Sequence, residues 1–410
     1  MTRGTSSSRA SHAGGAIHLD LCDRAVFADG PPHDQFRWLR DEAPVAFFSE
    51  PDGPGFWGVF RYDDVIEVSR HPTQFGSGPS VFIREPPDGD SAGASELLIN
   101  LDPPRHTQLR KLVNRGFTPR QIAALEPRVR ALVVDLLDQA QARGDFDLVA
   151  DVAVEVPLQV IAELVGVPNE DRHKVFAWTE RMMSSEADAE TITADARVAM
   201  GEMFAYADTL AAERVNGDGD DLLSVLLRAE VDGDRLTQMD VDVFFMLLMN
   251  AGSETTRNLI TGGTLALFEH PEERARLAAD PSLLPTAIEE MLRWVTPVMH
   301  FRRTARDDCE LGGQAIKAGD KVVMWYGSAN RDERAFPDAD RFDVGRTPND
   351  HVAFGAGGPH FCLGASLARL EARVLFEELL ARLPDLEPTG PPRRLKSNFI
   401  NGIMELPVRA

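Results

Sequence analysis

Cysteine is one of the scarcest residues in this chain, and its scarcity excludes the disulfide-stapled class of small secreted proteins. The three cysteines among the 410 residues are Cys22, Cys309 and Cys362. Three thiols cannot build a disulfide framework, so we expect the chain to work in a reducing compartment, the cytoplasm. The first residues are rich in serine, glycine and alanine but lack the apolar core of a signal peptide. We therefore expect residues 1–16 to be a disordered tail.

Long apolar runs and positive charge are scarce as well. The longest apolar run, residues 241–252, contains Asp242 and Asn250 and is shorter than the roughly 20 residues that span a bilayer. Lysine and arginine number 43 against 65 acidic residues, which gives a formal net charge of −22. A chain this acidic is not expected to bind nucleic acid or an anionic membrane surface. Its hydrophobic fraction of 43% is ample for a folded core.

A glycine-rich loop around the third cysteine carries the clearest chemical signal. The segment Phe354–Gly364 (FGAGGPHFCLG) sets Cys362 directly before an apolar-periodic run, residues 363–382, that predicts a helix. The N-terminal end of such a helix favours a thiolate, which can ligate iron, and His360 can reach an acidic group of a cofactor. A structural cysteine in a glycine-rich turn is the alternative. A phosphate-binding loop is excluded because the glycines do not fit G-x-G-x-x-G and no Lys-Ser/Thr follows.

The longest predicted helix begins at the capping-box sequence Thr237–Asp240 and ends near Glu269, before a His-Pro dipeptide. At 1.5 Å per residue it would be about 50 Å long, enough to cross a whole domain. Its middle, residues 251–256 (AGSETT), contains a glycine and a glutamate that weaken a helix interior, and it follows the apolar run 243–249. A polar centre in a buried helix indicates function there.

Two pairs of charged residues carry little information alone. His106 and Arg110 lie four apart on a helix for which Asp102 is the expected N-cap, so they share a face that is ordinarily solvated. Glu290 and Arg293 are an i,i+3 pair, which is ordinarily a surface ion pair worth a few tenths of a kcal/mol. Their meaning therefore depends on the other motifs in the chain.

Together and in this order, the motifs resemble the cytochrome P450 superfamily from about residue 30 to the end. The Phe354–Gly364 loop is similar to the haem-ligand loop of that family, in a form one residue longer than the commonest, as in bacterial members that act on lipids and steroids. The resemblance implies haem b with the Cys362 thiolate as the axial ligand of its iron. Three further loop residues would surround the haem: Phe354, Gly355 and Gly364.

The resemblance also assigns residues to the haem propionates and to dioxygen. Four basic residues would hold the propionates: His106, Arg110, Arg303 and His360. Arg302, beside the third of these, is an alternative to it. The small residues Ala251 and Gly252 of the long helix would leave room for dioxygen, and the acid–alcohol pair Glu254-Thr255 would relay protons to it.

A structural triad and a substrate pocket are implied in the same way. Glu290 and Arg293 would pair with Arg341 and brace the loop that leads to Cys362. Six residues would face the substrate: Val81, Phe82, Leu248, Val298, Met299 and Ile400. The Gly- and Pro-rich segment 76–96 would cover the substrate, and Met182 and Met183 lie in a region that would roof it. A methionine pair is more often core filler than a substrate contact.

The fold class that the resemblance implies is mostly α with a smaller β region. Residues 17–410 would form a single cytochrome P450 domain, with haem between the long helix and the Cys362 loop. The function implied is a monooxygenase that inserts one atom of O₂ into a C–H bond of a lipophilic small molecule, such as a steroid, a branched lipid or a terpenoid. Because no reductase sequence is fused to the chain, electrons would come from NAD(P)H through a separate ferredoxin and ferredoxin reductase.

Three segments indicate which members of the family the chain resembles most. Residues 54–57, 101–104 and 398–403 are similar to those of actinobacterial steroid and branched-lipid hydroxylases, and secondary-metabolite tailoring enzymes share these features. The competing class is a haem-thiolate protein that senses or scaffolds without catalysis. The Glu254-Thr255 pair argues against that class, since a sensor has no need of proton delivery.

Overall fold

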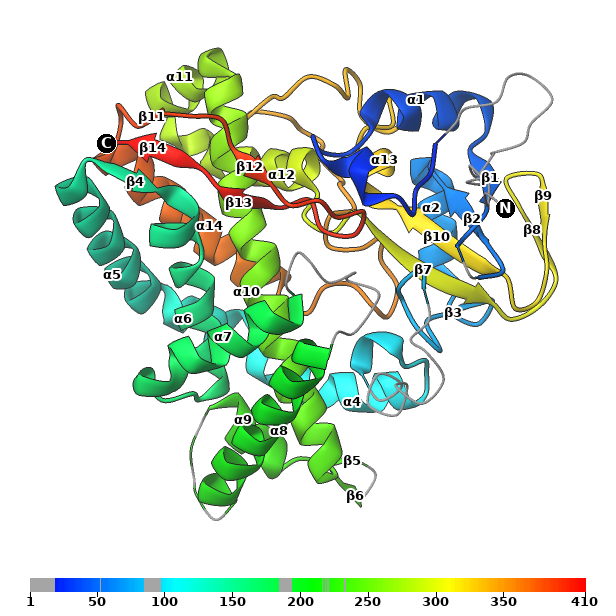
Figure 1. The fold of residues 1–410 in the computed structure, drawn as a ribbon, viewed down its shortest axis with the longest axis horizontal. Coiled ribbons are helices and arrows are strands. Elements are labelled where there is room, and N and C mark those ends of the chain that lie inside the picture. Colours follow the sequence, from blue (N-terminus) through cyan, green and yellow to red (C-terminus); the bar gives the residue numbers. More distant parts are fainter. Residues whose placement is uncertain are drawn as a thin grey trace, which may run out of the picture.

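A helical part and a smaller sheet part lie side by side in the computed structural model (Figure 1). The structure describes residues 19–51, 53–84, 97–183, 194–215, 217, 219, 221–231 and 234–410. Its arrangement confirms the expected fold class, mostly α with a smaller β region. Of the segment expected to cover the substrate, residues 85–96 lie outside the described residues, as does the side chain of Met183. Met182 packs against the main hydrophobic core, as a core filler does.

The largest sheet forms the end of the molecule opposite the helices. Its strand order is β1-β2-β10-β7-β3, with β2 and β10 parallel and the other neighbours antiparallel. The strands are β1 (Val45–Phe48), β2 (Phe56–Val59), β3 (Phe75–Gly76), β7 (His300–Ala305) and β10 (Lys321–Trp325). Every residue of the central strand β10 is buried, and its Lys321 is neutralised by Glu50 at 2.8 Å. Burial of a charge in the middle of a sheet requires such a partner.

Four smaller sheets complete the strands. The strands β12 (Arg393–Arg394) and β13 (Ile403–Glu405) form a hairpin, as expected from the Asn-Gly signal near its tip. The others are β4 (Asp145–Asp147) with β11 (Glu387–Pro388) and β14 (Pro407–Arg409), β5 (Glu230–Val231) with β6 (Asp234–Arg235), and β8 (Cys309–Leu311) with β9 (Gln314–Ile316). An isolated bridge joins Ile400 of the hairpin tip to Val298. The hairpin therefore reaches the segment that leads into β7.

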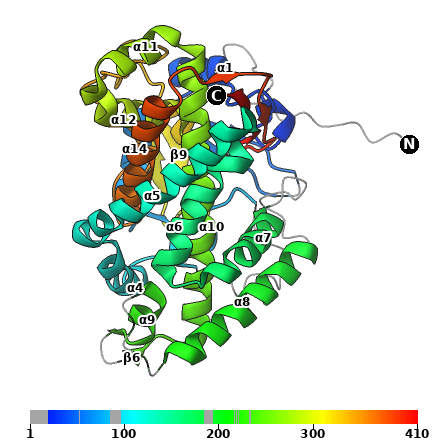
Figure 2. The ribbon, with the colours of Figure 1, turned by 90° about the vertical axis from the view of Figure 1, so that its left-hand side faces the viewer.

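The helix α10 (Gln238–Glu269) runs through the middle of the helical part (Figure 2). Thr237 and Asp240 form the expected capping box, and the helix ends directly before His270, as expected. Among the described helices, those packed on it include α6 (Glu155–Val165), α7 (Arg172–Met183), α8 (Ala194–Arg214), α9 (Leu222–Leu227), α11 (Pro271–Ala279), α12 (Leu284–Val295) and α14 (Ala365–Arg382). With so many neighbours, α10 is buried along most of its length.

Five further helices lie within the described residues. They are α1 (His33–Glu42), α2 (Tyr62–Arg70), α4 (Arg105–Val113), α5 (Pro119–Arg143) and α13 (Tyr326–Ala329). Short helical turns occupy Arg24–Phe27, Leu98–Asn100, Asn114–Phe117, Val149–Ala153, Asn169–Asp171 and Pro281–Leu283. The α5 helix packs along α14, so the helix that follows Cys362 is supported on both sides.

The start of α4 differs from the expectation. Asp102 does not cap this helix, which begins at Arg105 without a side-chain cap. Its carboxylate instead accepts hydrogen bonds from the backbone N–H groups of Ser77 and Gly78, at 2.9 and 3.2 Å, and pairs with Arg306 at 2.7 Å. Backbone donors are available at a helix N-terminus too, but here the segment after β3 supplies them together with the Arg306 cation. Asp102 therefore ties α4 to the sheet.

Candidate active site

A cavity with about 1490 Å³ of empty space lies between α10 and the loop that leads into α14. It brings together many of the residues predicted from the sequence, from widely separated parts of the chain. Those that line it are His106, Arg110, Leu248, Ala251, Gly252, Thr255, Val298, Arg303, Phe354, Gly355, His360, Cys362 and Gly364. The expected arrangement, in which a site lies between the long helix and the Cys362 loop, is therefore present in the fold.

The Cys362 loop has its shape because glycine occupies positions that other residues cannot. Gly355, Gly357 and Gly358 all have positive φ angles, and a Cβ on Gly358 would lie 2.4 Å from the carbonyl oxygen of Ser69. The loop is closed by a hydrogen bond from the N–H of Cys362 to the carbonyl of Phe354, at 2.9 Å. The sulfur is thereby presented to the cavity from a fixed turn.

The Cys362 thiol is exposed to the cavity but enclosed by protein, and its electrostatics follow from that position. Burial raises the pKa of the thiol, whereas a hydrogen bond from the Gly364 N–H and the guanidinium groups of Arg110 and Arg369 lower it. Burial outweighs the favourable helix end that the sequence suggested. A coordinated metal ion would reverse this balance, since a coordinating thiol is deprotonated outright.

A group of basic side chains lies in the same cavity: His106, Arg110, Arg303 and His360. We call it the cationic cluster after its two arginines. The imidazole rings of His106 and His360 are 4.1 Å apart, and neither ring nitrogen of His106 has a hydrogen-bond partner. Burial lowers the pKa of His106 to about 4 and that of His360 to about 2.

The two arginines of the cationic cluster are bonded only to neutral groups. Arg110 donates to the backbone carbonyl of Phe361, and Arg303 donates to that of Arg302 at 2.8 Å. Within the described residues neither forms an ion pair with an acid. Arg302 points away from the cavity, toward the carbonyls of Phe82 and Ile83. Of the two candidate arginines, Arg303 is therefore the one that faces the site. One buried and one half-buried guanidinium without an anion among the described residues fit a cofactor that carries acidic groups.

The polar centre of α10 places a hydroxyl on the cavity wall. Thr255 lines the cavity, and its Oγ1 donates to the carbonyl of Ala251 at 2.9 Å. Gly252 is required for packing as well, because a Cβ there would lie 2.7 Å from Cγ1 of Ile161 on α6. The missing side chain, which the sequence suggested would make room for dioxygen, also allows two helices to approach closely.

Glu254 does not line the cavity that its neighbour faces. Its carboxylate is largely buried and forms an ion pair with Arg257, one turn along the same helix. Burial raises the pKa of Glu254, and the guanidinium of Arg257 lowers it. The predicted acid–alcohol pair is therefore split in this structure: the alcohol faces the cavity and the acid faces away.

One buried carboxyl in the cavity wall was missed by the sequence analysis. Glu371 of α14 lines the cavity and is 1% exposed, with one oxygen bonded by Thr256 and the other without a partner. Burial raises its pKa to about 8, so the group is largely protonated at neutral pH. The signal was present, because Glu371 interrupts the apolar face formed by Leu367, Leu370 and Val374.

The predicted substrate residues divide into two groups. Leu248 and Val298 line the cavity, but the other four do not. Met299 and Ile400 line a separate small pocket under the hairpin tip, Val81 is buried where its carbonyl accepts from the N–H of Arg302, and Phe82 packs on Phe399 with ring centres 5.0 Å apart. The cavity is instead lined by apolar residues for which the sequence gave no signal: Leu98, Ile99, Ile161, Leu247, Leu292, Pro297 and Phe301.

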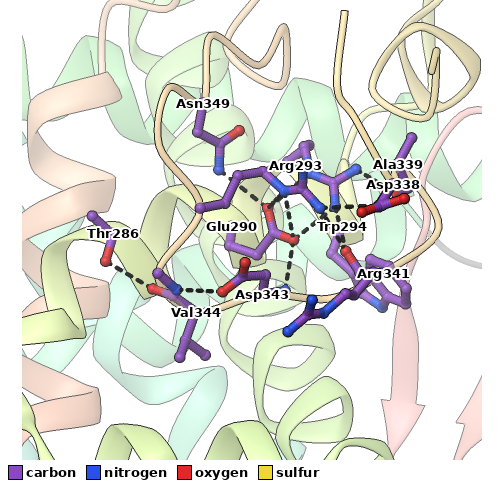
Figure 3. Close-up of polar contacts among 12 residues, drawn as sticks. Thr286, Glu290, Arg293, Trp294, Asp338, Ala339, Arg341, Asp343, Val344 and Asn349 are labelled. Carbon is purple, nitrogen blue, oxygen red and sulfur yellow. Dashed lines mark hydrogen bonds and ion pairs between the residues drawn. The ribbon is translucent and has the colours of Figure 1, made fainter.

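The predicted structural triad contains one wrong residue. Glu290 and Arg293 are fully buried and paired at 2.7 Å (Figure 3). The third member is Arg346, whose Nε lies 3.1 Å from Glu290. The Arg341 side chain is 62% exposed, and only its backbone carbonyl accepts from Arg293, at 3.1 Å. Asp338, in the turn before Arg341, has a φ angle of 52°, and its backbone carbonyl accepts a hydrogen bond from Arg346. The turn therefore presents backbone carbonyls to the cluster and leaves the Arg341 side chain outside it.

Nothing in the described part of the chain is a helix with the length and apolarity to cross a membrane. Comparisons with known proteins agree with the site. A family model described as cytochrome P450 matches residues 203–404. The methyl-branched lipid omega-hydroxylase of Mycobacterium tuberculosis is 44% identical over 405 residues, covering 96% of this chain and 94% of its own length.

Further relatives extend the comparison. The steroid C26-monooxygenase of Rhodococcus jostii is 42% identical over 400 residues, covering 95% of this chain and 84% of its own. A solved Mycobacterium marinum cytochrome P450 in complex with pseudoionone superposes with a TM-score of 0.90 at 41% identity, covering 96% and 99% of the two chains. Since these relatives match nearly the whole chain, the protein belongs to the cytochrome P450 family of oxidoreductases, which use a haem-thiolate iron and O₂.

Proposed function

We propose that the cavity holds haem b, with the Cys362 sulfur as the axial ligand of the iron. The observation that carries this proposal is the cationic cluster, which has no acidic partner within the described residues and shares one cavity with a thiol. The carboxylates of a porphyrin supply the missing anions, in charge-assisted bonds worth roughly 1.5–3 kcal/mol each. When bound, a haem-thiolate iron activates O₂, because the thiolate supplies electron density that favours O–O cleavage.

The reaction we propose is hydroxylation of a C–H bond in a lipophilic substrate, such as a steroid, a branched lipid or a terpenoid. The apolar lining of the cavity by Leu247, Leu248, Val298 and Phe301 supports this class, as do the names of the lipid and steroid hydroxylases that the chain resembles. Such a lining excludes water and holds an alkyl chain without specific polar contacts. Electrons come from NAD(P)H through a separate ferredoxin and its reductase, in the cytoplasm.

Thr255 has the role of a proton donor at the cavity wall in this proposal. In this structure its hydroxyl donates to the Ala251 carbonyl, so the hydroxyl must turn from that carbonyl toward the cavity before it can pass on its proton, which water then has to replace. Glu254 is the acid one residue earlier in the sequence, and its carboxylate forms an ion pair with Arg257. General acid–base assistance of this kind contributes typically 10²–10⁴-fold to a rate.

The test has two stages. A spin-state screen of the haem-loaded protein with steroids, fatty acids and terpenoids identifies a substrate, and turnover then gives the product formed per NAD(P)H consumed. We expect Thr255→Ala to bind substrate normally but to divert electrons into hydrogen peroxide. Thr264→Ala is the matched control, because Thr264 makes the same bond to a carbonyl one turn earlier, at 2.9 Å, without lining the cavity. Equal coupling in both variants and in Glu254→Gln would remove the assigned proton route, and a substrate that binds but is never oxidised would indicate a sensor.

A further inference from the structure

Arg331 is a buried arginine whose hydrogen bonds are almost all missing. Its side chain is 6% exposed and its guanidinium carbon lies 3.4 Å from the ring centre of Trp294. Among the described residues it makes one long hydrogen bond, 3.5 Å to the Trp294 carbonyl, and one long ion pair, 3.6 Å to Asp340. The Nε atom has no partner. Burial lowers the pKa of this arginine to about 9. A buried cation this poorly bonded is costly unless another group completes its shell.

A second cavity, with about 710 Å³ of empty space, lies beside Arg331 and apart from the active cavity. Its walls come from the N-terminal segment, α10, the end of α12 and the β12–β13 hairpin, which meet where the red and dark-blue ribbons approach each other (Figure 1). The lining includes a second arginine, Arg394, and His33. Within the described residues Arg394 makes no hydrogen bond or ion pair, and His33 Nδ1 is buried without a partner.

The inner end of this second cavity has a positive electrostatic potential. Burial and then the guanidinium groups of Arg331 and Arg40 hold the pKa of His33 well below its usual range, and Arg37 and Arg394 act in the same direction. Two acids also line the cavity, Asp29 and Glu269, and both are exposed. The cavity is therefore positive inside and acidic at its mouth.

We propose that the second cavity is a binding site for a small oxyanion, held between Arg331 and Arg394. A carboxylate or a phosphate supplies the acceptors that these guanidinium groups lack, in the bidentate geometry that arginine favours. A singly charged carboxylate is the expected ligand, because removing water from a doubly charged phosphate in a buried site costs much more, and the acids at the mouth also repel the doubly charged ion more strongly. This site is independent of the haem and of the oxidation reaction.

The competing explanation is an internal ion pair. The Arg394 side chain is partly exposed, and a change of rotamer that brings it to Asp29 or Glu269 would satisfy it without a ligand. Under that explanation Asp29→Asn lowers the melting temperature and leaves the response to anions unchanged. Under the proposal Asp29→Asn does not lower it, and it raises the affinity for oxyanions, most of all for phosphate.

The experiment measures thermal unfolding of the haem-loaded protein at constant ionic strength while chloride is replaced by formate, acetate or phosphate. We expect a saturable rise in melting temperature with formate and acetate, since a ligand that binds the folded state stabilises it. Arg394→Gln should weaken the apparent affinity for formate at least tenfold. Arg393→Gln is the matched control, because Arg393 is the adjacent exposed residue and pairs with Glu405 at 2.6 Å.

The outcomes separate cleanly. A saturable formate response that survives in Arg393→Gln and is lost in Arg394→Gln supports the site. No oxyanion response in the wild type, or an equal response in Arg394→Gln, overturns it. Crystals of the haem-loaded protein grown in formate give the second readout: density for the ion between Arg331 and Arg394 is expected, and an Arg394 side chain bound to Asp29 contradicts the proposal.

Discussion

Two buried clusters of charged side chains, one around Glu290 and one around His106, use similar residues in opposite ways. In the Glu290 cluster each guanidinium nitrogen of Arg293 donates a hydrogen bond, and both Glu290 oxygens accept from Arg293 and further donors (Figure 3). In the cationic cluster the ring nitrogens of His106 have no partners, and the two arginines bond only to neutral carbonyls. One cluster is complete in the protein alone, whereas the other requires a group that the protein does not supply.

The difference teaches where to look for function in a buried polar region. Buried polar groups that bond fully to each other hold the fold, and removing one strands the rest. Buried cations that lack anions cost stability by themselves and are explained only by a bound partner. The two clusters should therefore respond in opposite ways to substitution, and the following variants test that contrast.

The largest effect is expected from Arg293→Met. This change leaves Glu290 as a buried charge without its main partner, at a cost of about 3–5 kcal/mol in the free energy of unfolding. Denaturant unfolding of the haem-loaded protein measures it. A variant that folds, retains haem and unfolds at the wild-type denaturant concentration would mean that the completed network carries no stability.

Arg346→Gln and Arg341→Gln form a matched pair, because the sequence pointed to one and the structure points to the other. Arg346 bonds Glu290 from a nearly buried position, so its loss should cost about 1.5–3 kcal/mol. Arg341 is mostly exposed, so its loss should change stability by no more than about 0.5 kcal/mol. The same unfolding measurement compares them, and a reversed order would restore Arg341 as the third member.

Arg110→Gln tests the cationic cluster. Because this arginine has no acidic partner within the described residues, the haem-free variant should be at least as stable as the haem-free wild type. Loss of one charge-assisted bond should nevertheless speed haem dissociation about tenfold or more. Haem transfer to excess apomyoglobin gives the rate. A destabilised haem-free variant with unchanged haem release would place Arg110 among the structural residues instead.

Asp242→Asn is expected to have the smallest effect and gives the pH dependence. Asp242 is buried on α10 and its carboxylate accepts one bond, from Gln238 at 2.8 Å; burial raises its pKa to about 6. A raised pKa means that its contribution to stability is complete below about pH 4 and is lost as pH rises through 6. The variant should therefore gain on the wild type between pH 4 and 7, by about 1 kcal/mol, because burial and the like charge of Asp208 disfavour only the ionised carboxylate, which asparagine lacks.

Unfolding curves at several pH values compare the two proteins. If the difference in unfolding free energy between variant and wild type is constant from pH 4 to 7, the Asp242 carboxyl has an ordinary pKa. Its incomplete hydrogen bonding then does not lower the stability of the protein. No ligand is expected here, since Asp242 does not line either cavity described above.

Local signals predicted the main elements well. The Thr237–Asp240 capping box and the His-Pro dipeptide set both ends of α10 because backbone donors and proline geometry act within a few residues. The Cys362 loop was recognisable because its glycines are required by positive φ angles, which depend on the loop itself. The fold class, and a site between α10 and the Cys362 loop, came from the family resemblance that these motifs carry together.

The direction in which individual side chains point could not be predicted from the sequence. Arg341 and Arg346 both follow the same turn, and only the folded backbone decides which guanidinium enters the Glu290 cluster. Glu254 and Thr255 are neighbours on a helix, so they point about 100° apart, and packing decides which one faces the cavity. The role of Gly252 depends equally on Ile161, which lies far away in the sequence.

The central claim, that the cavity holds haem on the Cys362 sulfur, is tested most directly by the absorption spectrum of the reduced protein with carbon monoxide. The wild type, Cys22→Ser and Cys309→Ser should all show the strongly red-shifted Soret band of thiolate-ligated haem. Cys362→Ser should lose that band, whether or not haem remains bound. A thiolate spectrum that persists in Cys362→Ser would contradict the account, because the ligand would then have to come from another part of the chain.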